Sequence, residues 1–377
     1  MPGFETIGKE EKKALNQLFE EGGILFAHGF EKLRKKYHVR DFESKFASFM
    51  NAKYGLAVTS GTSAIKIGLK ALGVKPGDHV ITQSFNFIAT VEAILDCGAK
   101  PIIVNIDDTL NMCVDDLKKK ITKKTKVIIP VHMLGVSVEF DQIQNIAKKN
   151  NIKILEDNCE TLMGKYKNKY LGTLGDVGVL SLDFGKFITS GEGGIILTNN
   201  KKIEKYCREY HDHGHENNPK FSRGNDTKKI FGFNYRMTEM QAVVGKVQLK
   251  KIKKIFYEGR KRYLIIDRFL NKSIKRRKIP QNSIPNFDTF IFFVDNNIKK
   301  KQLLNYLNRI GLGTKNIPSA LKWHCSYYWD HIFSKKEITN FKKTNLILKK
   351  SIAIPISLNK SIIFYKNLAK KINEILQ

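Results

Sequence analysis

Short apolar runs alternate with amphipathic segments through the first half of the chain. The apolar runs predict buried strands, and the intervening segments repeat apolar positions at helical spacing. Strands that alternate with helices form a mostly parallel sheet covered on both faces. The predicted strands are 54–58, 79–82, 100–106, 126–132 and 152–157; the predicted helices are 9–21, 31–50, 60–72, 87–97, 114–122 and 139–150.

Two further strand-like runs, 177–183 and 195–198, enclose the stretch SLDFGKFITSGEGG at 181–194. Its lysine, Lys186, stands between Phe184 and Phe187 and precedes a glycine-rich turn. A lysine in an apolar turn loses hydration, which disfavours its charged form. Such an amine can attack a carbonyl and form a Schiff base, so Lys186 is the candidate catalytic residue.

The pattern changes after residue 200. A helix at 201–212 is followed by a polar loop at 213–233 and a long amphipathic helix at 238–271. The remaining segments predict a second α/β layer, with strands at 289–295 and 352–358 and helices at 299–310 and 361–376. We therefore expect an α/β protein with a large domain over residues 1–255 and a smaller C-terminal domain over residues 256–377.

The net charge of +30 raises nucleic acid as a partner, but only 11 of the 66 basic residues are arginine. Bidentate recognition of phosphate and bases favours arginine, and the lysines are spread along the whole chain. We therefore expect no specific nucleic-acid partner. Five scattered cysteines, no apolar leader and no apolar run long enough for a membrane helix predict a soluble cytoplasmic protein.

Candidate binding residues follow several predicted strands, where open parallel sheets bind ligands. The turn TSGTSA at 59–64 opens a helix and suits a phosphate, because its small residues let backbone N–H groups approach an anion. An aromatic of SFNF at 84–87 can stack on a planar ring, Asp157 can face a ring nitrogen, and Ser181 can add a hydroxyl. With Lys186, these are the parts of a pyridoxal 5′-phosphate site.

The histidines His211, His213 and His215 lie on a loop without the spacing of a helical metal-ligand pair, so we expect no metal. His213 is instead a candidate substrate-loop residue. Arg223 and Arg236 are candidate anion-binding residues, because a guanidinium binds carboxylate or phosphate bidentately.

The ordered motifs TSGTSA, SFNFIAT, ILEDNCE, SLDFGKFITSGEGG and GFNYRMTEMQA resemble those of the DegT/StrS family of sugar aminotransferases. The resemblance covers about residues 24–260 and implies the aspartate-aminotransferase architecture, fold type I. It implies that Lys186 is the Schiff-base lysine and that the other cofactor-binding residues are Gly61, Thr62, Phe87, Asp157, Glu160, Ser181 and Asn234.

The resemblance also implies glutamate as amino donor, a keto-sugar as acceptor, and a homodimer in which Asn234 reaches the neighbouring subunit's phosphate. Lysine at 186 favours transamination, since the family's sugar dehydratases carry histidine there. Glu160 departs from the glutamine or histidine of many members. An ionised carboxylate there would repel the cofactor's phenolate, so Glu160 is expected to be protonated or to point elsewhere.

Short stretches, MPGFE at the start, DHGH at 212–215 and WH at 323–324, resemble the branch that aminates an 8-oxo form of the lipopolysaccharide sugar Kdo. That resemblance predicts 8-amino-3,8-dideoxy-manno-octulosonate (Kdo8N) as the product. Three alternatives stay open: a nucleotide-linked 4-keto-6-deoxy or 3-keto sugar as acceptor, dehydration of the sugar, and a non-catalytic regulatory or binding protein on the same scaffold.

Overall fold

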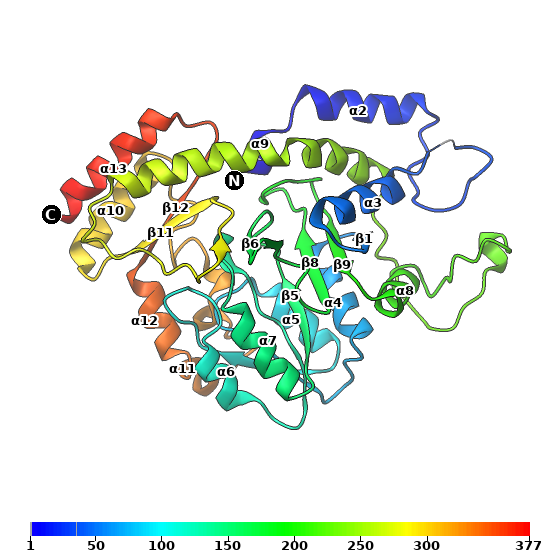
Figure 1. Ribbon diagram of the computed structural model, residues 1–377, viewed down its shortest axis with the longest axis horizontal. Helices are drawn as coiled ribbons and strands as arrows, with labels where there is room; N and C mark the ends of the chain where they lie inside the picture. Colours follow the sequence, from blue (N-terminus) through cyan, green and yellow to red (C-terminus); the bar gives the residue numbers. More distant parts are fainter. Residues whose placement is uncertain (1, 35) are drawn as a thin grey trace.

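A seven-stranded sheet lies at the centre of the computed structural model, which describes residues 2–34 and 36–377 (Figure 1). The strand order is β1-β9-β8-β5-β4-β2-β3. The strands are β1 (Tyr54–Val58), β2 (His79–Gln83), β3 (Lys100–Val104), β4 (Thr125–Ile128), β5 (Lys153–Asp157), β8 (Val177–Ser181) and β9 (Gly194–Thr198).

The sheet is mostly parallel, as predicted. Only β9 runs against its neighbours, β1 and β8, because a tight return follows β8. Helices connect β1 to β2, β2 to β3, β3 to β4 and β4 to β5, whereas β5 leads to β8 through β6 and β7. Consecutive residues such as Val80 and Ile81 enter hydrophobic clusters on opposite faces of the sheet. The crossover helices are α4 (Gly61–Ala71), α5 (Ala89–Asp96), α6 (Val114–Lys120) and α7 (Phe140–Lys149).

The helix α9 (Glu239–Phe269) runs along one side of the whole molecule (Figure 1). A capping box between Thr238 and Gln241 fixes its start. Its first half packs against α2 (Lys9–Glu20) and α3 (His38–Met50), and its second half packs against α13 (Ile362–Leu376). One rigid element therefore supports both ends of the chain.

The C-terminal layer consists of the antiparallel pair β11 (Thr289–Phe293) and β12 (Ser351–Pro355) with α10 (Asn297–Arg309) and α13. Phe290, Phe292, Leu303 and Leu368 fill its core. The boundary expected at residue 255 falls inside α9, which continues unbroken across it. The remaining elements are α1 (Pro2–Glu5), α8 (Lys201–Tyr210), α11 (Lys335–Thr339), α12 (Lys342–Lys350), β6 (Lys165–Tyr166), β7 (Lys169–Tyr170) and β10 (Ser283–Ile284).

A buried arginine joins this layer to the central sheet. The Arg277 guanidinium donates hydrogen bonds to the carbonyl oxygens of Thr109, Met133 and Leu134, at 2.6, 2.7 and 3.0 Å. Burial lowers the pKa of Arg277 to about 9. Because three carbonyls from two loops of the sheet converge on one side chain, the C-terminal layer is held in a defined place beside those loops.

The helix expected at 31–50 begins later, at His38. Residues 31–34 form turns, and residue 35 lies outside the described residues. The buried side chain of Arg34 pairs with Glu239 at 3.4 Å and bonds the Phe26 carbonyl, so this segment folds back toward the start of α9. These contacts outweigh the helical periodicity of residues 31–37. The structure also adds α11 and α12, which lie in a region for which the sequence predicted no helix.

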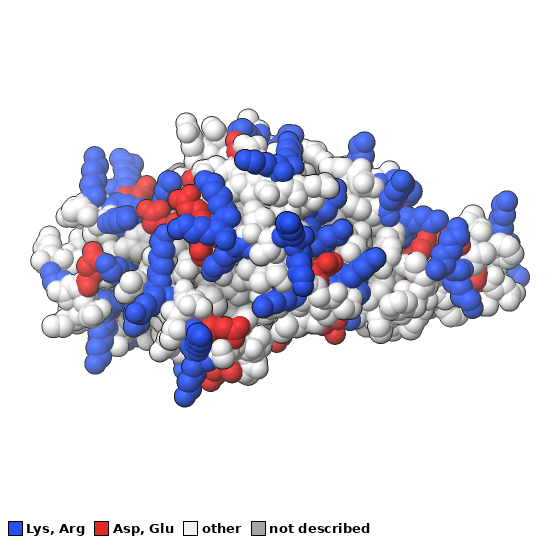
Figure 2. Space-filling model, turned by 90° about the horizontal axis from the view of Figure 1, so that it is seen from below, with Lys and Arg blue, Asp and Glu red and all other residues white. Residues whose placement is uncertain are grey.

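Lysine and arginine side chains are spread over the face seen in Figure 2, with acidic groups among them. This distribution is that of a chain-wide composition, not of one basic groove. Within the described residues, no helix has both the length and the apolar character that a membrane crossing requires.

Two glycines of α9 provide a matched test of the α3–α9 packing. A methyl group at Gly245 would lie 2.6 Å from the ring of Phe42, which is fully buried and cannot swing away. A methyl group at Gly259 meets its nearest atom at 3.4 Å. We predict that Gly245→Ala lowers the free energy of unfolding by about 1–3 kcal/mol. Gly259→Ala should raise it by up to about 1 kcal/mol, since alanine favours helix.

Urea unfolding of the two variants beside the parent chain measures both changes. Equal stability of the two variants would contradict the tight crossing at Gly245.

Candidate active site

The carboxyl ends of β1, β5 and β8 open into a cavity of about 430 Å³. These strands point the same way, so the residues that follow them meet at one edge of the sheet. The cavity brings together most of the cofactor-binding residues predicted from the sequence: Gly61, Thr62, Phe87, Asp157, Glu160, Ser181 and Lys186.

Lys186 lies in the return between β8 and β9. Its ammonium donates a hydrogen bond to Glu160 Oε1 at 2.5 Å, and both side chains are mostly buried. Burial alone would lower the pKa of Lys186, but Glu160, with smaller contributions from Cys159 and Asp183, outweighs burial and raises that pKa. Conversely, burial favours neutral Glu160, yet Lys186, His324 and Lys315 together lower its pKa to about 2. Glu160 is therefore ionised and directed at Lys186. Its expected relation to the cofactor's phenolic oxygen stays a prediction.

Asp157 ends β5 with its side chain toward the cavity. Its carboxylate accepts hydrogen bonds from the Thr90 hydroxyl at 2.8 Å and from the Cys159 backbone N–H at 3.1 Å. The neighbouring Glu156 points to the other face and accepts three backbone N–H bonds from residues 172–175. Sequence alternation thus separates a structural acid from one that can face a ligand.

The first turn of α4 forms one wall of the cavity. Ser60 caps the helix by accepting the Ser63 N–H. A methyl group at Gly61 would lie 3.0 Å from Ser181 and 3.1 Å from the Cys159 sulfur, so the close approach of this turn to β8 favours glycine. A helix N-terminus beside a serine hydroxyl suits a phosphate. Together with an acid and a buried amine in the same cavity, this donor set fits pyridoxal phosphate.

Phe87 and Phe85 have different surroundings, although the sequence SFNF did not distinguish them. Phe85 is fully buried in a hydrophobic cluster, whereas Phe87 is 44% exposed and lines the cavity. Its ring lies 5.1 Å from the ring of His324. Phe87 is therefore the aromatic residue that can stack on a planar ligand.

The structure adds cavity residues that sequence reasoning did not select. Thr90, Cys159 and Thr314 line the wall, and Lys315 and His324 come from the C-terminal layer. Burial lowers the pKa of His324 to about 4, so this imidazole is neutral near pH 7. The sequence pointed to His324 only through the WH pair at 323–324, one of the short stretches that resemble the Kdo8N branch of the family.

Four predicted residues are missing from the described cavity lining: Arg223, Arg236, His213 and Asn234. Arg223 and Arg236 both bind the carboxylate of Asp212, at 2.6 and 2.7 Å, and that carboxylate is fully buried. Within this chain the two guanidinium groups thus serve an internal ion pair. His213 and Asn234 are exposed on the lobe formed by residues 211–236, which also carries Arg223 and Arg236. Their predicted roles stay predictions.

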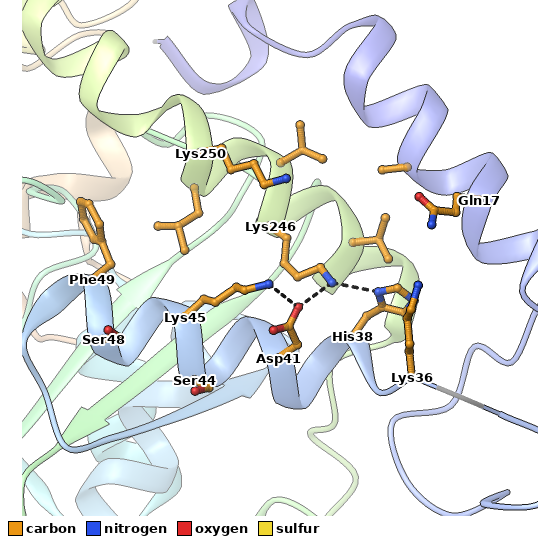
Figure 3. A pocket seen from close by; sticks show the side chains of 14 residues that line it. Gln17, Lys36, His38, Asp41, Ser44, Lys45, Ser48, Phe49, Lys246 and Lys250 are labelled. Atoms are coloured by element: carbon orange, nitrogen blue, oxygen red, sulfur yellow. Dashed lines mark hydrogen bonds and ion pairs between the residues drawn. The ribbon is translucent and has the colours of Figure 1, made fainter.

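A second groove, of about 810 Å³, lies between α2, α3 and α9 (Figure 3). Lys45 and Lys246 both bind Asp41 at 2.8 Å, and Lys246 also contacts His38 Nδ1 at 2.9 Å. These charged groups pair with one another across the helices. The smaller cavity at the strand ends gathers the more reactive chemistry, so we assign it as the active site.

Across the described residues, no group of three or more histidine, cysteine, aspartate or glutamate side chains is arranged to hold a metal ion. His211, from the loop motif, is buried and its Nδ1 contacts the Arg208 carbonyl. His215 pairs with Asp226 at 3.2 Å. These two histidines therefore have structural partners.

Comparison with known proteins matches the DegT/DnrJ/EryC1/StrS aminotransferase family to residues 7–361. GDP-perosamine synthase of Escherichia coli O157:H7 is 36% identical over 65% of this chain and 64% of its own length. A pleiotropic regulatory protein of Geobacillus stearothermophilus is 32% identical over 82% of this chain and 80% of its own. The chain spans 56–66% of the length of the GDP-perosamine synthases it matches.

Solved structures agree with the fold. An aminotransferase from Psychrobacter cryohalolentis superposes with a TM-score of 0.87 over 98% of this chain and 97% of its own, at 23% identity. This confirms the expected fold type I architecture. By the extent of its family match, the chain belongs to the DegT/DnrJ/EryC1/StrS aminotransferase family.

Proposed function

We propose that this protein is a pyridoxal phosphate-dependent aminotransferase that moves an amino group from glutamate to a keto-sugar. The observation that carries the proposal is the cavity at the strand ends, where the amine of Lys186, the carboxylate of Asp157 and the first turn of α4 converge. When bound there, the cofactor supplies an electron sink for the carbanion that forms during transamination.

The chain's own residues divide the work of binding. The first turn of α4 and the Ser181 hydroxyl hold the phosphate, because helix N–H groups favour an anion. Asp157 would keep the ring nitrogen protonated, and its hydrogen bonds from Thr90 and Cys159 fix its orientation. Phe87, which lines the same cavity, would stack on the ring.

Lys186 has two roles in this proposal. Its amine would hold the cofactor covalently, and once free it would move the proton at the substrate's α-carbon. The first role requires the neutral amine, whereas Glu160 stabilises the ammonium form. Glu160 therefore controls when Lys186 becomes nucleophilic.

For the acceptor we propose a nucleotide-linked 4-keto-6-deoxy sugar, used for a surface polysaccharide. The similarity to GDP-perosamine synthase supports this class. The 8-oxo octulosonate that would give Kdo8N is the second candidate, supported by the WH pair, since His324 lines the cavity. Both acceptors are anionic and suit a strongly basic protein.

We also infer a homodimer with shared active sites. The lobe that carries His213, Arg223, Asn234 and Arg236 contributes none of these residues to the cavity lining of its own chain. It lies next to that cavity, because the Tyr235 carbonyl accepts the Thr59 N–H at 3.0 Å, just before the first turn of α4. It is built around the buried Asp212 and presents exposed Phe221, Phe231 and Phe233. A lobe held by a buried ion pair and with exposed aromatic side chains suits an interface with a second copy of this chain.

The first test is cofactor loading. The parent chain, mixed with pyridoxal phosphate and desalted, should absorb visible light, and glutamate should bleach that band with release of 2-oxoglutarate. Lys186→Ala should lose the covalent band and lower turnover by at least about 10³-fold. The control is Lys149→Ala, which removes an exposed lysine of α7. Full turnover by Lys186→Ala would overturn the proposal. So would a parent chain that stays colourless, which would favour a regulatory role instead.

The second test concerns Glu160. Its carboxylate raises the pKa of Lys186, so in Glu160→Gln the burial that lowers this pKa is opposed only by the weaker contributions of Cys159 and Asp183. Neutral Lys186 then forms at lower pH, and we predict that the pH midpoint of cofactor loading falls by about 1–3 units. Stopped-flow absorbance across a pH series measures it. Glu192→Gln changes another carboxylate on the same cavity wall and serves as the control. An unchanged midpoint in Glu160→Gln would refute the pairing.

The third test identifies the acceptor. Enzyme first reacted with glutamate is offered GDP-4-keto-6-deoxymannose, a dTDP-linked keto-sugar and the 8-oxo octulosonate in separate reactions. We expect the visible band to return fastest with a nucleotide-linked sugar, and the product to be a stable amine by mass spectrometry. Return with the octulosonate alone would reverse the order of the two candidates. A deoxy keto product without nitrogen would indicate dehydration.

A further inference from the structure

The N-terminal segment contacts the backbone of the loop at 182–193, which joins β8 to β9, carries Lys186 and is called the lysine loop below. The Gly3 N–H donates a hydrogen bond to the carbonyl oxygen of Lys186 at 3.1 Å. The segment forms a single helical turn, α1, in which Pro2 and Gly3 are buried. Gly3 and the candidate catalytic lysine, Lys186, are thus far apart in sequence but in direct backbone contact.

This contact leaves no room for a side chain. A methyl group at Gly3 would lie 2.5 Å from the Lys186 carbonyl oxygen and 3.1 Å from the backbone carbon of Ile188. Both neighbours are backbone atoms, so they cannot rotate away as a side-chain tip could. Substitution at Gly3 therefore has to displace either the N-terminal segment or the lysine loop.

The next residue adds a second contact to the same loop. The Phe4 ring stacks on Phe184 with centroids 5.3 Å apart and an interplanar angle of 22°. Phe184 lies two residues before Lys186, so residues 3 and 4 contact the loop at two positions, Phe184 and Lys186. Aromatic pairs of this geometry contribute about 0.5–1.5 kcal/mol beyond their buried area.

The segment is itself anchored on α9. The Lys251 ammonium donates to the Thr6 carbonyl and to Glu11 Oε1, both at 2.7 Å. Glu11 is 2% exposed and also accepts a hydrogen bond from Gln248 at 2.9 Å. Because α9 is the long rigid element of the fold, a contact anchored on it restrains what it touches.

A further bond ties the segment to the C-terminal layer. The Leu358 N–H donates to Glu5 Oε2 at 2.6 Å. Residues 2–6 thus join α9, the C-terminal layer and the lysine loop. Inside that loop, the Lys186 N–H donates to the Asp183 carbonyl at 3.0 Å, while the Lys186 carbonyl accepts from the Gly3 N–H.

We propose that Gly3 and Phe4 are positioning residues for Lys186. Through their contacts with its carbonyl and with Phe184, they fix the loop backbone so that the lysine amine stays over the active-site cavity. This inference rests on the proposed function of Lys186, and it gives the MPGFE start of the chain a role in the reaction. Small displacements matter here, since about 1 Å of misplacement can lower a rate about 100-fold.

The experiment compares three variants of the full chain. Gly3→Ala inserts the clashing methyl group, and Phe4→Leu removes the ring stack at a partly exposed position, where folding is not at risk. Gly8→Ala is the matched control, because its methyl group meets no atom within 4 Å. Amide hydrogen exchange by mass spectrometry reports the loop directly, in peptides covering residues 182–192, with and without cofactor.

We expect Gly3→Ala to speed exchange in this peptide about tenfold, with β5 and β8 unchanged, and to lower kcat about 10- to 100-fold. The KM for glutamate should stay within about twofold, since its binding groups are unaltered. Phe4→Leu should lower kcat about threefold, in line with one aromatic pair. Gly8→Ala should match the parent chain in each measurement.

Parent-like exchange and kcat in Gly3→Ala would overturn the inference. So would exchange that rises evenly across the sheet, or the same losses in Gly8→Ala, because either would indicate general destabilisation. Exchange needs neither cofactor nor substrate. A colourless parent chain would therefore refute the proposed function, while the exchange data would still test the contact between Gly3 and the lysine loop.

Discussion

A buried ammonium needs a partner, and in this protein the carboxylate of Glu160 provides it for Lys186. The pair forms where the carboxyl ends of parallel strands meet, because β8 leads into the lysine loop and β5 leads to Glu160. The remaining cavity residues surround that pair. Asp157, Ser181 and the first turn of α4 come from the same strand ends, so the sheet fixes their relative positions.

Long-range contacts then hold this arrangement from outside the sheet. The helix α9 anchors the N-terminal segment against the lysine loop. The same helix packs against α13 of the C-terminal layer. That layer returns Lys315 and His324 to the cavity, and Arg277 joins it to the loops of the sheet. The active site is therefore assembled from the beginning, middle and end of the chain.

The sequence predicts the sheet well because its strands are short apolar runs bounded by turns. Tyr54–Val58 is recovered residue for residue. The sequence also predicts residues at the carboxyl ends of strands, such as Asp157 and Ser181, since strand direction alone places them in the cavity. It does not reveal that Arg223 and Arg236 bind Asp212, or that Gly3 meets Lys186, because those pairs depend on tertiary packing. The ionised state of Glu160 likewise depends on charges from distant elements.

The central claim is that one lysine among 55 carries the cofactor. Borohydride reduction of the loaded protein, followed by proteolysis and mass spectrometry, tests it most directly. The account predicts a single pyridoxyl-phosphate adduct per chain, on Lys186. An adduct on another lysine, or label spread over the many exposed lysines, would contradict it.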